Sequence, residues 1–131
     1  MKQKKIVNTD KAPAAIGIYS QGTISGDMAY ISGQIPLDPI SMEIVIGDFD
    51  KQATQVFKNL DAVANACGAN LNHFIKLTIY LTNLKYFQNL NTMMENLFDA
   101  PFPARAVIEV SALPKGALIE IEGIIDLSLS A

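Results

Sequence analysis

The chain has 131 residues, of which 50% are hydrophobic and 18% are charged, and its formal net charge is −3. This length predicts one domain, residues 1–131, with a core that needs no disulfide to hold it together. The negative charge argues against a protein that binds the phosphate backbone of nucleic acids. The one basic cluster is Lys2, Lys4 and Lys5, which we interpret as a solvated tail.

Cysteine content and hydropathy limit the compartment and the chemistry. Cys67 is the only cysteine, so no intrachain disulfide is possible and the cytoplasm is the expected location. No apolar run is long enough for a membrane span, and the polar residues of "IVNTDKAPAAIG" are unlike a signal-peptide core. One cysteine and one histidine cannot form a structural zinc site, and we expect no metal. A Cys67–His73 nucleophilic pair is formally possible, but Cys67 lies on the apolar stripe of a predicted helix and is interpreted as a core residue.

The first part of the chain predicts three strands. "KKIV" indicates a short strand, and "KAPAAIGIYSQG" is a loop rich in small residues. "GTISGDMAYISGQI" indicates two strands joined by a turn at Gly26-Asp27. The two prolines of "PLDPISMEIVIGD" favour an exposed loop.

Two helices and three further strands follow. Residues 49–67 carry apolar residues at steps of three and four, with Asp48 or Asp50 as a cap and Gly68 as the end. "FIKLTIYLT" (74–82) alternates like a strand with one apolar face, and residues 84–98 predict a second helix. "RAVIEV" and "ALIEIEGIIDL" complete the order β-β-β-α-β-α-β-β. This order is typical of an α+β fold in which the helices cover the apolar face of the sheet.

The segment "PFPARAVIEV" places an arginine behind two stiff prolines. Alternation puts Arg105 and Val107 on one face of the strand and Ala106 and Ile108 on the other, and we expect the second face to be core. Arg105 is either a surface charge whose stem covers apolar neighbours or a bidentate clamp for a carboxylate.

Glu120 and Glu122 share one face of the last strand, as a solvated pair or as a general acid/base or water-positioning group. The short connection "SALPKGA" predicts that this strand pairs with the Arg105 strand as a hairpin. That would bring a carboxylate within reach of the guanidinium, and an internal salt bridge would give the same pattern. Asn91 falls within the apolar stripe of the second helix, where it either reaches water at the edge or supports a site.

Two weaker signals lie in the first half of the chain. Tyr19 follows the Gly17 loop, and Ser32-Gly33 interrupts an otherwise apolar strand. A glycine at such a place allows another backbone or a ligand to approach closely.

Together the motifs "APAAIGIYSQG", "ISGQIP", "PFPARAVIEV" and "LPKGALIEIEG" resemble the Rid (YjgF) family of enamine/imine deaminases, from about residue 8 to residue 127. The resemblance implies a chorismate-mutase-like fold: a mixed sheet with two helices on one face, assembled as a homotrimer with sites between subunits. It implies hydrolysis of 2-iminobutanoate, 2-iminopropanoate and related imines to 2-keto acids and ammonia. The imines arise from enamines such as 2-aminoacrylate, which pyridoxal-phosphate dehydratases release. No metal or organic cofactor is implied.

The resemblance also implies roles for individual residues. Arg105 would bind the substrate carboxylate and Glu120 would orient the attacking water, which makes them the expected catalytic residues. The expected substrate-binding residues are Tyr19, Ser32, Gly33, Asn91 and Val107. Two positions depart from the family pattern, since many members have Pro in place of Ile18 and Cys in place of Val107.

Two other functions remain open at this stage. A trimer could use the same clefts to sense small carboxylates or 2-keto acids without turning them over. A ribonuclease or translation inhibitor, as some relatives are described, is disfavoured by the acidic composition. The expected partners are therefore a small imino or enamino acid and two further copies of the chain, with no nucleic acid and no membrane.

Overall fold

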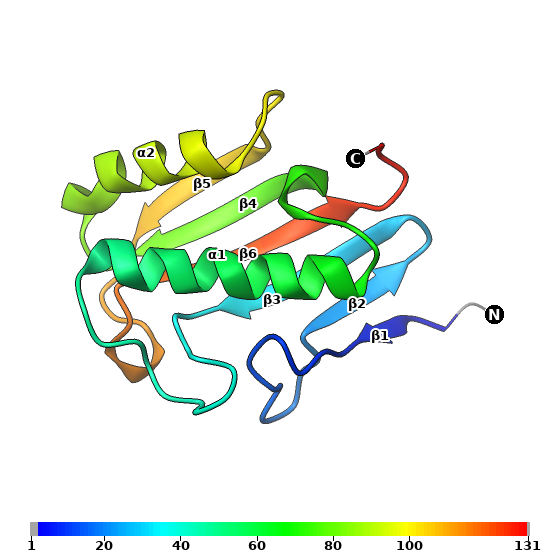
Figure 1. Cartoon of the computed structure of the whole chain (residues 1–131), viewed down its shortest axis with the longest axis horizontal. Helices are drawn as coiled ribbons and strands as arrows, with labels where there is room; N and C mark the ends of the chain where they lie inside the picture. The colour runs from blue at the N-terminus through cyan, green and yellow to red at the C-terminus, as the bar shows by residue number, and fades with distance from the viewer. Residues whose placement is uncertain (1–2, 131) are drawn as a thin grey trace.

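The computed structural model in Figure 1 describes residues 3–130. The two helices are α1 (Phe49–Ala66) and α2 (Phe87–Leu97). The six strands are β1 (Lys5–Val7), β2 (Gly22–Ser25), β3 (Met28–Gln34), β4 (Phe74–Leu81), β5 (Ala104–Glu109) and β6 (Ile119–Asp126). Short 3₁₀ turns cover Leu71–His73, Leu84–Tyr86 and Pro114–Gly116. The order of strands and helices predicted from the sequence is confirmed.

The strands form one mixed sheet in the order β1-β2-β3-β6-β4-β5. Every neighbouring pair is antiparallel except β4 and β5, which run parallel. Both helices lie on the same side of the sheet, with α1 packed against β3 and β6. The α+β class and the placement of both helices on one face are thus confirmed, and the opposite face of the sheet is left open.

The predicted hairpin between the Arg105 strand and the Glu120 strand is wrong. β5 pairs only with β4, and β4 lies between β5 and β6. The helix α2 between β4 and β5 explains this pairing, because a helical crossover returns the chain parallel to the strand it left. A short connection therefore does not decide which strands are neighbours.

The predicted core face of β5 is also wrong. Arg105 pairs with Leu77, and Val107 pairs with Ile79, and both partners are fully buried beneath the helices. Arg105 and Val107 therefore point to the helix side, while Ile108 lies on the open face and is 44% exposed. An edge strand covered only by the short helix α2 can place a charged side chain on the helix side, because solvent still reaches it.

The core beneath α1 explains why this helix forms where the periodicity predicts it. The Asp48 side chain accepts a hydrogen bond from the Lys51 amide at 3.0 Å, and Gly68 adopts the left-handed conformation with φ 78° after the last turn. The inward stripe, which includes Val56, Leu60 and Val63, is fully buried.

Cys67 and His73 do not form a nucleophilic pair. The half-buried Cys67 thiol donates to the Val63 carbonyl at 3.4 Å, and burial raises the pKa of the thiol. The buried His73 ring accepts from the Asn70 amide at 3.1 Å and caps the turn before β4. The interpretation of Cys67 as a residue that packs against the core is confirmed.

Candidate functional site

The first group of predicted site residues lies at the edge of the sheet, where α2 meets β5. The Arg105 guanidinium donates from Nη2 to Asn91 Oδ1 at 2.7 Å and from Nη1 to Met94 Sδ at 3.5 Å. It also lies 5.3 Å from the centre of the Phe87 ring, whose face stabilises the positive charge through a cation–π interaction. These contacts hold the guanidinium in place without neutralising its charge, since none of the three side chains is acidic.

Arg105 opens onto a cavity of about 340 Å³, whose other lining residues are Asn91, Met94, Glu95, Phe102 and Pro103. The cavity is mainly apolar, with the guanidinium as its cationic group. A planar, fixed guanidinium in such a place can bind a carboxylate through two parallel hydrogen bonds. The geometry therefore fits the interpretation of Arg105 as a bidentate clamp for a carboxylate.

The second group of predicted site residues gathers around Glu120. Tyr19, Gly33 and Glu120 line a cavity of about 390 Å³, together with loop residues that include Pro114 and Lys115. The pairing of β3 with β6 shifts between Ile31 and Gln34, so Ser32 and Gly33 form a bulge. The bulge brings the Gly33 backbone against the half-buried side chain of Glu120.

Two hydrogen-bonded side chains hold the loop that carries Tyr19. The Ser32 hydroxyl donates to the Ser20 carbonyl at 2.6 Å and ties the loop to the bulge of β3. The fully buried Gln21 accepts from the Thr9 amide at 2.7 Å and donates to the Pro13 carbonyl at 2.8 Å. These hydrogen bonds hold the backbone of the loop before Tyr19, at Pro13, and after it, at Ser20. The Tyr19 ring itself is 54% exposed.

The environment of Glu120 favours its protonated form. Burial raises the pKa of Glu120, and the negative charge of Glu122 raises it further. A carboxylate with a raised pKa is a stronger base than an ordinary glutamate when it is ionised. This property suits a group that must take a proton from water and return it.

We predict that Gly33→Ala lowers activity more than stability. A Cβ at Gly33 would overlap the Glu120 carboxyl group, which must then move. If Glu120 is a catalytic group, displacing its carboxyl group in this way lowers kcat/KM by about 10- to 100-fold while the melting temperature hardly changes. The control is Gly22→Ala, whose Cβ would meet Ile31 Cδ1 at 3.1 Å and the Tyr30 carbonyl at 3.2 Å. That variant should lose stability and keep its activity per folded molecule, and the reverse pattern would refute the prediction.

Arg105 and Glu120 lie on opposite faces of the sheet within one chain. Arg105 pairs with Leu77 on the helix side, whereas Glu120 pairs with Tyr80 on the open face. The two cavities share no lining residue among those described. The expectation that the guanidinium and the carboxylate meet within one chain is therefore wrong, and a single copy holds the two groups in separate cavities.

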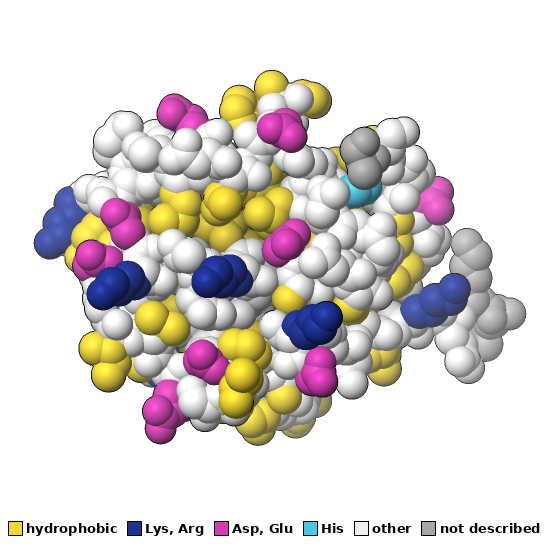
Figure 2. Space-filling model, viewed as in Figure 1, with side chains coloured by type: hydrophobic (Ala, Val, Ile, Leu, Met, Phe, Trp, Pro, Cys, Tyr) yellow, Lys and Arg dark blue, Asp and Glu magenta, His cyan; other side chains and the backbone are white. Residues whose placement is uncertain are grey.

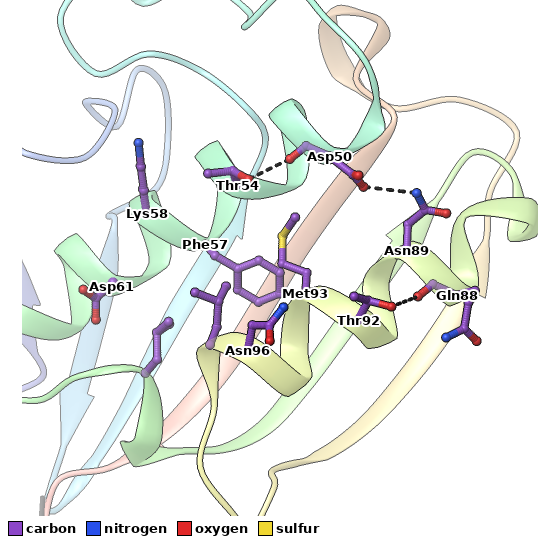
Figure 3. A pocket seen from close by; sticks show the side chains of 12 residues that line it. Asp50, Thr54, Phe57, Lys58, Asp61, Gln88, Asn89, Thr92, Met93 and Asn96 are labelled. Atoms are coloured by element: carbon purple, nitrogen blue, oxygen red, sulfur yellow. Dashed lines mark hydrogen bonds between the residues drawn. The ribbon is translucent and has the colours of Figure 1, made fainter.

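A larger groove of about 600 Å³ lies between α1 and α2, and the predicted site residues do not line it. Figure 2 shows hydrophobic side chains gathered between the two helices, and Figure 3 shows Phe57 and Met93 at its floor. Several polar groups at its rim bond to one another, as Asn89 does to Asp50 at 3.1 Å. The groove is thus a depression between two packed helices, which a hydrogen bond between Asn89 and Asp50 spans at its rim.

Some residues that hold Arg105 and the Tyr19 loop in place carry no signal in the sequence. Phe87 and Met94 belong to the apolar stripe of α2, and only the fold shows that they flank Arg105. Gln21 looks like an ordinary loop residue in "SQG".

No helix among residues 3–130 is long and apolar enough to cross a membrane. In the same range, no three His, Cys, Asp or Glu side chains are grouped as a metal site would require.

Comparisons with known proteins give a consistent family. A sequence model described as Endoribonuclease L-PSP matches residues 9–126. The RutC family protein y4sK of Sinorhizobium fredii is 44% identical over 122 residues, covering 93% of this chain and 97% of the relative. The 2-iminobutanoate/2-iminopropanoate deaminase of Rattus norvegicus is 41% identical over 121 residues, covering 92% of this chain and 88% of the relative. The crystal structure of RidA from an Antarctic Psychrobacter has 46% sequence identity and a TM-score of 0.90, covering 93% of this chain and 98% of that one.

Proposed function

The chain belongs to the Rid (YjgF) family, and we propose that it hydrolyses 2-imino acids such as 2-iminobutanoate and 2-iminopropanoate to 2-keto acids and ammonia. The observation that supports this proposal is the presence of two features in one chain. One is a guanidinium held by uncharged partners, and the other is a carboxylate with a raised pKa in a separate cavity. Relatives that carry the deaminase name support the reaction.

The chemistry needs little beyond positioning and proton transfer. Arg105 binds the substrate carboxylate and so fixes the carbon of the C=N bond. Glu120 takes a proton from a water that attacks this carbon and passes it to the nitrogen, which gives a carbinolamine. Glu120 then takes the proton of the new hydroxyl group and passes it to the same nitrogen as the C–N bond breaks. One water is consumed, the imine nitrogen leaves as ammonia, and the carbon becomes the carbonyl of the 2-keto acid.

The other predicted residues take supporting roles in this proposal. Tyr19 closes one wall of the Glu120 cavity, while Ser32 holds the Tyr19 loop and Asn91 orients Arg105. The Gly33 backbone helps to hold the substrate carboxylate. Val107 contributes its backbone near the imine nitrogen, because β5 is an edge strand whose outer backbone groups face away from β4.

We propose that the complete site forms between copies of a homotrimer. Arg105 and Glu120 point away from opposite faces of one sheet, so a complete site requires Arg105 from one copy and Glu120 from the next. The open face of the sheet also carries exposed apolar side chains, including Ile6 (67% exposed), Tyr30 (48%) and Ile108 (44%). Such a face is typical of a surface that is covered by another subunit.

A coupled assay tests the proposed function. Purified protein is added to a threonine dehydratase, and the release of 2-ketobutyrate is followed in a buffer where spontaneous hydrolysis of the imine is slow. The proposal predicts faster release in proportion to the added protein. No acceleration would exclude the deaminase, and if 2-ketobutyrate still bound, it would support a trimer that only senses small carboxylates.

A further inference from the structure

A second carboxylate on β6, Glu122, lies beside Glu120 and is held by a partner on the neighbouring strand. Residues two apart on a strand share a face, so both side chains project from the open side of the sheet. The Tyr80 hydroxyl donates a hydrogen bond to Glu122 Oε1. Tyr80 is itself the direct cross-strand partner of Glu120. The three side chains therefore share one face of the sheet, with Tyr80 opposite Glu120 in the register and hydrogen-bonded to Glu122.

We propose that Glu122, anchored by Tyr80, is a positioning residue that acts on the reaction through Glu120, a role that rests on the function proposed above. Glu122 lies outside the set of residues that line the Glu120 cavity, so it acts by its charge rather than by touching the substrate. A fixed negative charge on the same face makes ionised Glu120 less stable and therefore a better acceptor for a proton from water.

The behaviour of the two neighbours agrees with this geometry. The hydrogen bond to Glu122 raises the pKa of Tyr80 to about 12, so the hydroxyl keeps its proton and remains a donor. Without the tyrosine, the Glu122 side chain would lose its hydrogen bond and could adopt other rotamers that carry its charge away from Glu120. Tyr80 thus keeps the negative charge near Glu120.

Other titratable groups face the same cluster. Tyr19 and Lys115 line the Glu120 cavity, and Lys76 shares the open face of β4 with Tyr80. In the proposed trimer, Arg105 of a neighbouring copy faces this cavity as well. None of these groups is altered in the variants below, so the comparison isolates the charge of Glu122.

The test is the pH profile of kcat/KM for Glu122→Gln, combined with an NMR titration of the Glu120 side-chain carboxyl carbon. Glutamine keeps an oxygen that accepts from Tyr80 but removes the charge, so the acid limb and the Glu120 midpoint should both move to lower pH. Tyr80→Phe should move both in the same direction by less. The control is Glu109→Gln, which removes a carboxylate from the helix side of β5 and should leave both unmoved.

The outcomes distinguish this inference from the proposed function. An active wild-type protein in which Glu122→Gln leaves the limb and the Glu120 midpoint unmoved would refute the role of Glu122 alone. A wild-type protein without deaminase activity would refute the function, and the role in catalysis would fail with it. In that case the NMR midpoint still decides whether Glu122 controls the protonation of Glu120. A uniform loss of activity without a pH shift would mark Glu122 as merely structural and overturn the inference.

Discussion

Replacing Glu120 by glutamine is expected to lower kcat by about 10²- to 10⁴-fold, the usual contribution of a positioned general base. Glutamine fills nearly the same space but cannot take a proton from water. Binding of a 2-keto acid should survive, because the proposed carboxylate clamp, Arg105, is unchanged in this variant. Steady-state kinetics in the dehydratase-coupled assay and calorimetric titration with 2-ketobutyrate measure the two effects separately.

The pH dependence of the wild-type protein follows from the same residue. As the proposed base, Glu120 can accept a proton only when it is ionised, and its pKa is raised by burial and by the charge of Glu122. As the pH is lowered, activity should therefore begin to fall at a higher pH than it would if the pKa of Glu120 were that of an ordinary glutamate. The control, Glu43→Gln on an exposed loop, should behave like wild type.

A Glu120→Gln variant with the wild-type rate would remove Glu120 from the reaction.

Arg105→Lys is expected to lower kcat/KM by roughly 10²-fold, which corresponds to the loss of one charge-assisted hydrogen bond to the substrate carboxylate. Lysine keeps the positive charge but lacks the planar fork, so it cannot hold a carboxylate with two parallel bonds. A single ammonium group also cannot bond to Asn91 Oδ1, lie over the Phe87 ring and present two parallel donors to a carboxylate at the same time, as the guanidinium can. The loss should appear mainly in KM and in the affinity for 2-ketobutyrate.

A matched control for this substitution is Lys58→Arg, which exchanges the same two residue types beside the groove between α1 and α2. Because Lys58 lines neither the Arg105 cavity nor the Glu120 cavity, the kinetics of Lys58→Arg should equal those of the wild type. Arg105 is the only arginine in the chain, so no other guanidinium can replace it. Wild-type kinetics in Arg105→Lys at an unchanged melting temperature would contradict the proposed clamp.

Local patterns predict the elements of this fold well, because they depend on neighbours in the sequence. The periodicity of 49–67 and the cap at Asp48 mark α1, and the alternation of 74–82 marks β4. A bulge between Phe74 and Lys76 alters this alternation, so Phe74 joins the buried side and Ile75 is 39% exposed. Bulges depend on how strands pair, and the alternation alone does not contain that information.

The arrangement of the candidate site is predicted less well, since it depends on contacts between distant segments. The chain order α2 between β4 and β5 implies a parallel pair, yet the short loop between β5 and β6 suggested a hairpin. That one error in pairing placed Arg105 and Glu120 together, whereas the sheet separates them. The residues around Arg105 also look like core in the sequence, because Phe87 and Met94 follow the spacing of an apolar stripe.

Mixed trimers test directly whether two copies of the chain complete one site. Arg105→Lys and Glu120→Gln chains with different tags are coexpressed, and assemblies carrying both tags are purified and assayed beside each parent variant. In every mixed trimer one of the three sites would join an intact Arg105 to an intact Glu120, so the purified mixed assemblies should show about a third of the wild-type activity. A mixture that is no more active than its two parents, although both tags are present in one assembly, would contradict the shared site.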